Sequence, residues 1–166
     1  MNEHINDEDT RVALLARIYN GDMPPLRIGD WVNAFVGKTK TLNEIDLKKK
    51  IMIRRIKKNQ EKNTEDIIPL PASLVKFIKD RGIKGDLFPN MTVVQIDQLL
   101  HKTYPDKKAT PHIYRSLYTV NILSKLTDKE EILSRLKIMD HSLEVNSAYY
   151  NKQESSSAYN SLLAKK

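Results

Sequence analysis

Six side chains, read in chain order, form a set that suits chemistry on a phosphodiester. They are Arg27, Lys57 or its neighbour Lys58, His112, Arg115, His141 and Tyr150. During phosphodiester cleavage, negative charge gathers on the phosphate oxygens while one oxygen enters and another leaves. Arginines offer paired donors to such oxygens, and a tyrosine supplies an oxygen nucleophile. The set therefore predicts a site that breaks and reseals a DNA strand, with no metal ion and no cofactor.

The spacing of four of these residues adds information. His141 precedes Tyr150 by nine positions, and His112 precedes Arg115 by three. Two residues that are three apart on a helix project from the same face. Each residue also has an ordinary interpretation: a surface pair for His112 and Arg115, a favourable cation at a helix end for His141, and partly buried aromatic rings for Tyr149 and Tyr150.

Arg27 stands at the start of a predicted helix, just after two prolines. A positive group at a helix N-terminus opposes the helix dipole, so this placement is locally unfavourable and favours a functional role. Asp30 follows one turn later. Its carboxylate is predicted either to orient the Arg27 guanidinium or to compensate the dipole of the first turn.

Helices are the main elements predicted to position these groups. Apolar spacing, capping signals, prolines and glycines predict helices over 7–20, 27–37, 73–81, 92–103, from 110 onward, 127–140 and 145–150. The second helix is expected to direct Trp31, Phe35 and Val36 into the core. Thr127 and Glu130 are predicted to form the capping box of the helix that ends near 140.

A small β element interrupts the helices. Ile51 and Ile53 alternate with other residues as in a strand, and 67–70 reads as the partner strand. The polar segment between them, 58–66, predicts a hairpin tip. The expected fold is α+β: mainly α-helical, with a small antiparallel β-sheet near the N-terminal third.

Charge points to a polyanionic partner. The 166 residues carry a net charge of +7, and between Lys38 and Lys62 there are ten Lys or Arg residues but only three acids. Such a stretch attracts nucleic acid and releases its counterions, although it is also typical of a solvated basic face. No apolar run reaches the roughly 20 residues that a membrane helix needs. The absence of cysteine and the acidic N-terminus predict an intracellular, non-secreted protein.

The order and spacing of the six groups resemble the catalytic domain of the tyrosine recombinase (phage integrase) family. The family's pattern is an arginine with an acid one turn later, a hairpin lysine, H-x-x-R, a histidine or tryptophan, and a tyrosine nine residues further on. The matching segments here are 25–30, 43–57, 67–71, 110–115 and 140–150.

The resemblance implies a domain organisation. The chain also departs from the family's pattern at several positions. It predicts a catalytic domain over 1–152 and a tail over 153–166 that docks on a neighbouring protomer, with the family's N-terminal core-binding domain absent. Met23-Pro-Pro-Leu26 replaces the usual Thr-Gly-Leu. Asp140 replaces a glycine, so a differently built turn is expected there. The hairpin tip is long, which leaves both Lys57 and Lys58 as candidates. An ungapped alignment of 43–57 favours Lys57. Neighbouring residues on a strand face opposite sides, so only one of the two lysines can be in the site.

The implied reaction is transesterification. Tyr150 attacks the scissile phosphate and forms a 3′-phosphotyrosine, and His112 accepts its proton. Arg27 and Arg115 bind the nonbridging oxygens. Lys57 protonates the leaving 5′-oxygen as general acid.

The implied partners are double-stranded DNA and further copies of the chain, assembled as a dimer or tetramer on DNA. In the implied reaction, His141 donates a further hydrogen bond to the scissile phosphate.

One alternative is DNA relaxation by a type IB topoisomerase-like enzyme. Those enzymes commonly have lysine at the position of His112, so this residue favours recombination or integration. The abundance of Lys, Ile and Asn indicates an AT-rich genome, as in a virus or mobile element. A second alternative is a noncatalytic DNA-binding protein that keeps the fold.

Overall fold

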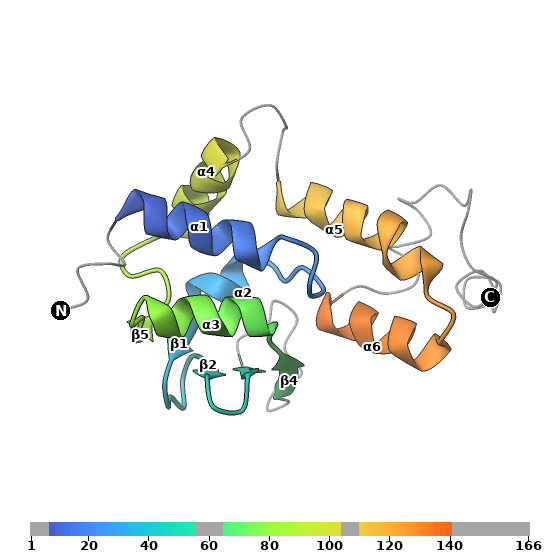
Figure 1. The fold of residues 1–166 in the computed structure, drawn as a ribbon, viewed down its shortest axis with the longest axis horizontal. Coiled ribbons are helices and arrows are strands. Elements are labelled where there is room, and N and C mark those ends of the chain that lie inside the picture. The colour runs from blue at the N-terminus through green and yellow to red at the C-terminus, as the bar shows by residue number, and fades with distance from the viewer. Residues whose placement is uncertain (1–6, 56–64, 104–109, 141–166) are drawn as a thin grey trace. The chain divides into compact units, whose positions relative to one another are not determined.

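The computed structural model describes residues 7–55, 65–103 and 110–140, and the chain divides into two compact units (Figure 1). Unit 1 consists of Met1–Met23 and Arg27–Ala109, and unit 2 of Pro24–Leu26 and Thr110–Lys166. Among the helices in these described ranges, none is long and apolar enough to cross a membrane.

Unit 1 contains four helices and a five-stranded sheet within its described residues. The helices are α1 (Glu8–Ile18), α2 (Ile28–Val32), α3 (Ala72–Asp80) and α4 (Val93–Thr103). The strands are β1 (Ala34–Val36), β2 (Asn43–Asp46), β3 (Ile51–Arg54), β4 (Asp66–Pro69) and β5 (Gly85–Asp86), in the order β4-β3-β2-β1-β5. The prediction of mixed helix and sheet is confirmed.

The prediction of a small antiparallel sheet is wrong for one pair of strands, because β1 and β2 run parallel while the other neighbours are antiparallel. The chain returns to the start of β2 through a short turn. Gly37 takes a positive φ of 123°, and the Thr39 hydroxyl accepts the N–H groups of Thr41 and Leu42. Glycine tolerates such a φ without strain, so the two short strands are joined without a long crossover.

The second helix is also shorter than predicted. Helix α2 ends at Val32, where the backbone and side-chain N–H groups of Asn33 both donate to the Gly29 carbonyl. Phe35 and Val36, which were expected in the helix, form β1 instead. Aromatic and β-branched residues favour a pleated surface, and pairing with β2 satisfies their backbone groups. Trp31 does reach the core, with 1% of its surface exposed.

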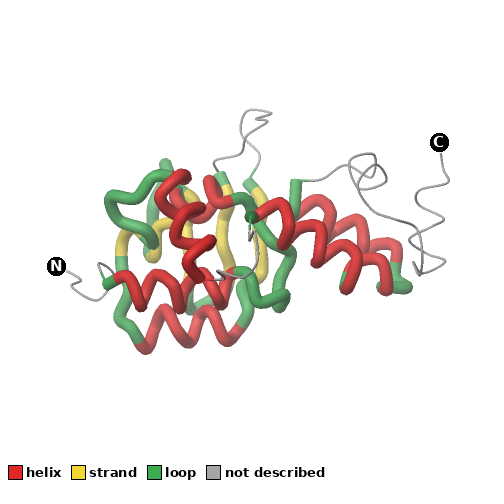
Figure 2. The backbone as a smooth tube through the Cα atoms, turned by 90° about the horizontal axis from the view of Figure 1, so that it is seen from above, coloured by secondary structure: helices red, strands yellow, loops and turns green. Residues whose placement is uncertain are grey.

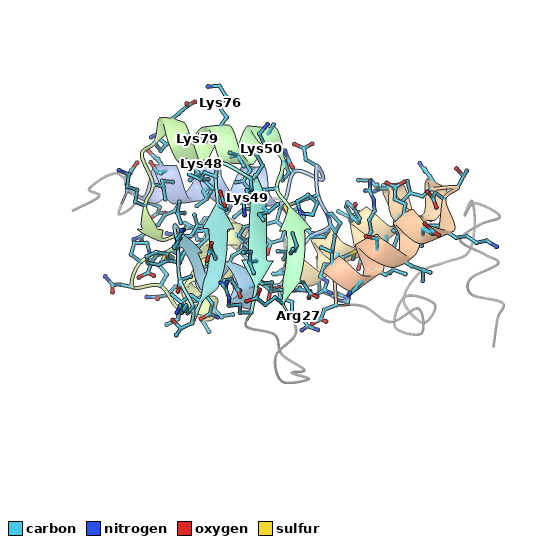
Figure 3. All side chains as sticks on the ribbon, turned by 90° about the horizontal axis from the view of Figure 1, so that it is seen from below. Arg27, Lys48, Lys49, Lys50, Lys76 and Lys79 are labelled. Carbon is cyan, nitrogen blue, oxygen red and sulfur yellow. The ribbon has the colours of Figure 1, made fainter. Side chains whose placement is uncertain are left out.

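Burial alternates along the strands, and this alternation separates the two faces of the sheet. On β3, Met52 and Arg54 are buried, whereas Ile51 and Ile53 are half-buried. The helices of unit 1 lie on one face of the sheet (Figure 2), and the other face is seen in Figure 3. The predicted pairing of β3 with β4 is confirmed, with Met52 opposite Ile68. Arg54 therefore points to the covered face.

Most predicted helix starts are confirmed by their caps. Asp7 accepts N–H groups at the start of α1, and Thr92 exchanges hydrogen bonds with Gln95 at the start of α4. In unit 2 the side chain of Thr110 caps α5 (Pro111–Asn121). Helix α6 (Lys129–Ile138) is capped by Asp128, one residue later than the predicted Thr127, because a carboxylate there accepts two N–H groups.

Unit 2 is a pair of helices with a small core. A 3-10 turn, η2 (Leu123–Lys125), connects α5 to α6, and the two helices lie side by side (Figures 1 and 2). Their shared core consists of Tyr118, Leu123, Ile132, Leu136 and Met139. The predicted helix over 145–150 and the tail over 153–166 lie outside the described residues.

Candidate functional site

The structure places three of the six predicted groups. Arg27 belongs to unit 1, and His112 and Arg115 stand on α5 of unit 2. The remaining candidates, Lys57, Lys58, His141, Tyr149 and Tyr150, lie outside the described residues. The two units are therefore described as separate half-sites. Within the described ranges, no three His, Asp or Glu side chains gather as metal ligands.

In unit 1, Arg27 is fixed at the N-terminal end of α2. It is the N-cap residue, and its backbone N–H donates to Asp30 Oδ2 at 3.1 Å. Asp30 is 6% exposed, and Arg27 is half-buried. The carboxylate thus contacts the backbone of Arg27, and its predicted orientation of the guanidinium stays a prediction. The carboxylate holds the residue from which the guanidinium extends.

The Asp30 carboxylate is itself held by a buried arginine that sequence reasoning did not single out. Arg54 is 1% exposed, and its Nη1 lies 3.5 Å from Asp30 Oδ2. Its Nη2 donates to Asp66 Oδ2 at 2.8 Å, directly across the β3–β4 ladder. Arg54 therefore joins the start of α2 to both strands that border residues 56–64. The alternation with Met52 was the signal in the sequence that Arg54 faces the core.

The next residue, Arg55, makes a second set of ion pairs. Its Nε lies 2.7 Å from Glu65 Oε1, and its Nη1 lies 3.4 Å from Glu44 Oε2. Its backbone N–H donates to Asn43 Oδ1 at 2.8 Å, while the Asn43 amide donates to the Asp30 carbonyl at 2.9 Å. Fully buried Asn43 thus links β2, β3 and α2, and sequence reasoning missed this role also.

These contacts revise the interpretation of the basic stretch between residues 38 and 62. Arg54 and Arg55 are engaged with carboxylates, so they build the fold and are not part of a solvated face. Lys48, Lys49 and Lys50, in contrast, are exposed in the turn between β2 and β3. Neighbouring cations in the sequence therefore have different surroundings.

In unit 2, α5 presents His112 and holds Arg115 in place. His112 is exposed in the first turn of the helix, whereas Arg115 is 6% exposed. Arg115 Nη2 donates a hydrogen bond to the carbonyl of Met139, just after α6. A guanidinium carries five N–H donors, so an anchor at one nitrogen is compatible with binding an anion through others.

Asp140 shapes the turn that follows this anchor. Its φ is +58°, in the left-handed region that glycine favours, and its N–H donates to the Lys137 carbonyl at 3.0 Å. Aspartate tolerates this region better than most residues with a side chain. The residues that follow Asp140 lie outside the described ranges, so the expectation of a differently built turn stays a prediction. Asp140 adopts a conformation in which glycine is common.

One described tyrosine of unit 2 has a structural role. Tyr118 is 4% exposed, and its hydroxyl accepts a hydrogen bond from Arg135 Nη1. Burial raises the pKa of the Tyr118 hydroxyl above its ordinary value, although the charge of Arg135 opposes this shift. Arg135 Nη2 also pairs with Glu131 at 2.6 Å. A neutral, buried phenol of this kind stabilises the core and is unsuited to be a nucleophile.

The fold of this chain is similar to that of a solved protein, XerA recombinase. The likeness has a TM-score of 0.62 and covers 97% of this chain, at 16% sequence identity. The chain spans 61% of the length of that recombinase chain. At this identity the likeness shows the fold alone. No protein-family model and no curated protein sequence matches the chain.

Proposed function

We propose that this chain breaks and rejoins DNA strands through a covalent tyrosine–DNA link, as a protomer of a site-specific recombinase. The observation that carries the proposal is a recombinase-like fold over 97% of the chain. The same chain contains, in order, the six groups that the reaction needs. Neither a fold nor a list of residues would suffice alone, because one fold hosts many functions.

The surroundings of two arginines support the proposal. Arg27 extends from a backbone that the Asp30 carboxylate fixes, and Arg115 is anchored on the Met139 carbonyl. Donors that are held in place before the substrate arrives stabilise developing charge without a cost of reorganisation. In the proposed site, both guanidinium groups bind the nonbridging oxygens of one scissile phosphate.

The cleavage step transfers the phosphate from a DNA oxygen to Tyr150. A bond forms between Tyr150 Oη and phosphorus while the bond from phosphorus to the 5′-oxygen breaks. A tyrosine hydroxyl ordinarily has a pKa of about 10, so the step needs a proton acceptor, and His112 takes this role. Lys57 gives a proton to the leaving 5′-oxygen. The products are a 3′-phosphotyrosine and a free 5′-hydroxyl.

Rejoining is the reverse of this step with the same or another DNA strand. The 5′-hydroxyl attacks the phosphotyrosine, Tyr150 leaves, and His112 returns its proton. The phosphotyrosine conserves the energy of the phosphodiester bond, so the reaction needs no nucleoside triphosphate. His141 gives a further hydrogen bond to the phosphate. Exchange between two duplexes requires several protomers, so we propose that the chain assembles on double-stranded DNA as a dimer or tetramer.

The nucleophile is tested with a nicked duplex that loses its 5′-hydroxyl fragment after cleavage, so that the covalent complex accumulates. The chain and its Tyr149→Phe variant are expected to form a covalent adduct that survives denaturing electrophoresis. The Tyr150→Phe variant is expected to form none. An adduct of normal yield in the Tyr150→Phe variant would falsify the assignment.

The general acid is tested with a substrate whose leaving oxygen is replaced by sulfur, which departs without protonation. This substrate should restore adduct formation to the Lys57→Ala variant, and the Lys58→Ala variant should not need it. The opposite pattern would transfer the role to Lys58.

A further inference from the structure

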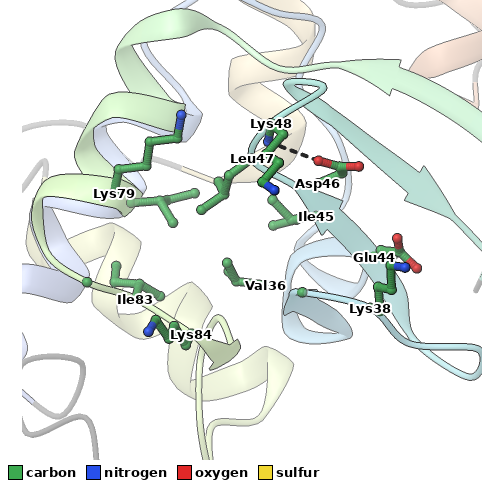
Figure 4. Close-up of a pocket in the computed structure, with 13 residues that line it drawn as sticks. Val36, Lys38, Glu44, Ile45, Asp46, Leu47, Lys48, Lys79, Ile83 and Lys84 are labelled. Atoms are coloured by element: carbon green, nitrogen blue, oxygen red, sulfur yellow. Dashed lines mark hydrogen bonds between the residues drawn. The ribbon is translucent and has the colours of Figure 1, made fainter.

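Unit 1 contains an open groove of about 540 Å³ between the end of α3 and the strands β1 and β2 (Figure 4). Its walls are mostly aliphatic. The apolar side chains that line it are Val36, Ile45, Leu47, Ile78 and Ile83. Its volume lies within the range of about 300–1,000 Å³ that is common for ligand sites.

Four lysines surround these apolar walls. They are Lys38, Lys48, Lys79 and Lys84. They come from separate segments: the chain after β1, the β2–β3 turn, α3, and the loop before β5. Among the described residues, no carboxylate forms an ion pair with the ammonium groups of Lys38, Lys48 or Lys79. Figure 4 shows Lys48 and Lys79 near one end of the groove.

The two acids that line the groove are already engaged by the protein. Glu44 accepts the N–H of Thr39 and pairs with Arg55. Asp46 Oδ1 accepts the backbone N–H groups of Lys48 and Lys49 at 2.9 and 3.0 Å. Their charges are directed to intrachain partners, so the rim presents a net positive charge to a ligand.

This groove is separate from the half-site around Arg27. Strand β3 starts after the turn that holds Lys48 and ends at Arg54, which reaches the start of α2. Figure 3 shows Arg27 at one end of the sheet, and Lys48, Lys79 and their neighbours at the opposite end. A DNA phosphate held by Arg27 therefore does not occupy the groove.

Apolar walls and a lysine rim together fit a ligand that is both apolar and acidic. A nucleic-acid backbone complements the lysines but offers no aliphatic side chain to the walls. An open groove also leaves a small molecule largely in water, whereas an extended or helical peptide covers it. The chain's own residues 161–166, Ser-Leu-Leu-Ala-Lys-Lys, have apolar side chains but the same charge as the rim.

We propose that the groove binds an acidic amphipathic segment of a partner protein. Leu- or Ile-like side chains of that segment enter the groove, and flanking Asp or Glu side chains pair with the lysines. This inference stands apart from the proposed strand cleavage, because Arg27, His112 and Arg115, the predicted catalytic groups within the described residues, do not line the groove.

The test uses a fluorescently labelled synthetic peptide with Leu at every third and fourth position and Glu elsewhere, titrated with the full chain. Saturable binding is expected, and its affinity should fall as salt screens the charges. The Lys48→Glu/Lys79→Glu double variant is expected to bind about tenfold or more weakly, because both contacts become repulsive.

Two matched controls isolate the groove. Lys76→Glu makes the same charge change on α3, but Lys76 does not line the groove and pairs with Asp80. This variant should bind within about twofold of the unchanged chain. A peptide with Ser in place of Leu should bind weakly.

Three results would overturn the proposal. The first is equal peptide affinity for the double variant and the unchanged chain. The second is equal affinity of the Leu and Ser peptides. The third is a dependence on Lys48 and Lys79 that appears only for a DNA duplex. A thermal melt of each variant verifies that it is folded.

Discussion

The two ends of the sheet in unit 1 use positive charge in opposite ways. At the end near Arg27, Arg54 and Arg55 contact four carboxylates, and Arg54 is 1% exposed. At the other end, Lys48, Lys49 and Lys50 are exposed. The same strand, β3, connects both ends, so a few residues separate a cation that builds the fold from cations that face solvent.

The comparison explains why a basic stretch cannot be assigned one function as a whole. A buried arginine with two carboxylates is costly to disrupt, because removing it leaves charges with little access to water. An exposed lysine contributes little to stability and is available to a ligand. Mutations at the two ends should therefore separate stability from binding.

The largest expected effect is that of Arg54→Ala. Loss of this guanidinium leaves the Asp30 and Asp66 side chains, which are 8% and 14% exposed, without their buried cation. We expect the free energy of unfolding to fall by about 3–5 kcal/mol, the range for breaking a buried ion pair. Urea denaturation measures this change. If the free energy of unfolding falls no further than for substitution of an exposed lysine, the two ends of the sheet do not differ in their contribution to stability.

Arg55→Ala should have an intermediate effect. The Arg55 side chain is 20% exposed and contacts one half-exposed and one mostly buried carboxylate. We expect a loss of about 1 kcal/mol in the same measurement, close to the net contribution of one typical hydrogen bond. An effect equal to that of Arg54→Ala would show that burial does not decide how much each arginine contributes to the free energy of unfolding.

Reversing charge at the lysine end should leave both folding and cleavage nearly unchanged. For Lys48→Glu/Lys79→Glu, the free energy of unfolding should change by no more than about 0.5 kcal/mol, as for other surface substitutions. The rate of covalent adduct formation should also be retained, because these residues lie at the opposite end of the sheet from Arg27. A large fall in that rate would place DNA at the lysine end as well.

The smallest expected effect concerns Asp46 in the lysine turn. The backbone N–H of Lys49, more than any other contact, lowers the pKa of Asp46 below its ordinary value of 3.8. Its stabilising contribution is therefore complete above 3.8 and is lost as the pH falls through the lowered pKa. The Asp46→Asn variant should lose less stability on acidification. Thermal melts of both proteins across acidic pH measure the difference, and identical pH profiles would exclude this contribution.

Helices were predictable from the sequence because their signals are local. Asp7, Thr92 and Thr110 cap helices where the pattern placed them. The strand β1 was missed because Phe35 and Val36 fit a helical face as well as a strand. Only their pairing with β2, which starts at Asn43, decides between the two.

The structure places three of the predicted site residues, whose roles stay a prediction, together with supporting contacts that the sequence did not reveal. Arg27, His112 and Arg115 were predicted from their order and chemistry, and the structure places them at the start of α2 and on α5. Arg54 was counted within the basic stretch of residues 38–62, because its partners Asp30 and Asp66 are distant in the sequence. The hydrogen bond from Arg115 to the Met139 carbonyl could not be predicted either, because every residue type has a backbone carbonyl.

The central proposal is that Arg27 and Arg115 neutralise the same scissile phosphate. A substrate with a methylphosphonate at that position tests it directly, because the group lacks the negative charge that the arginines bind. On an ordinary phosphate, Arg27→Ala and Arg115→Ala should each abolish most adduct formation at Tyr150. On the methylphosphonate, both variants should approach the rate of the unchanged chain. If the neutral substrate relieves only one variant, or neither, the two arginines do not share that phosphate.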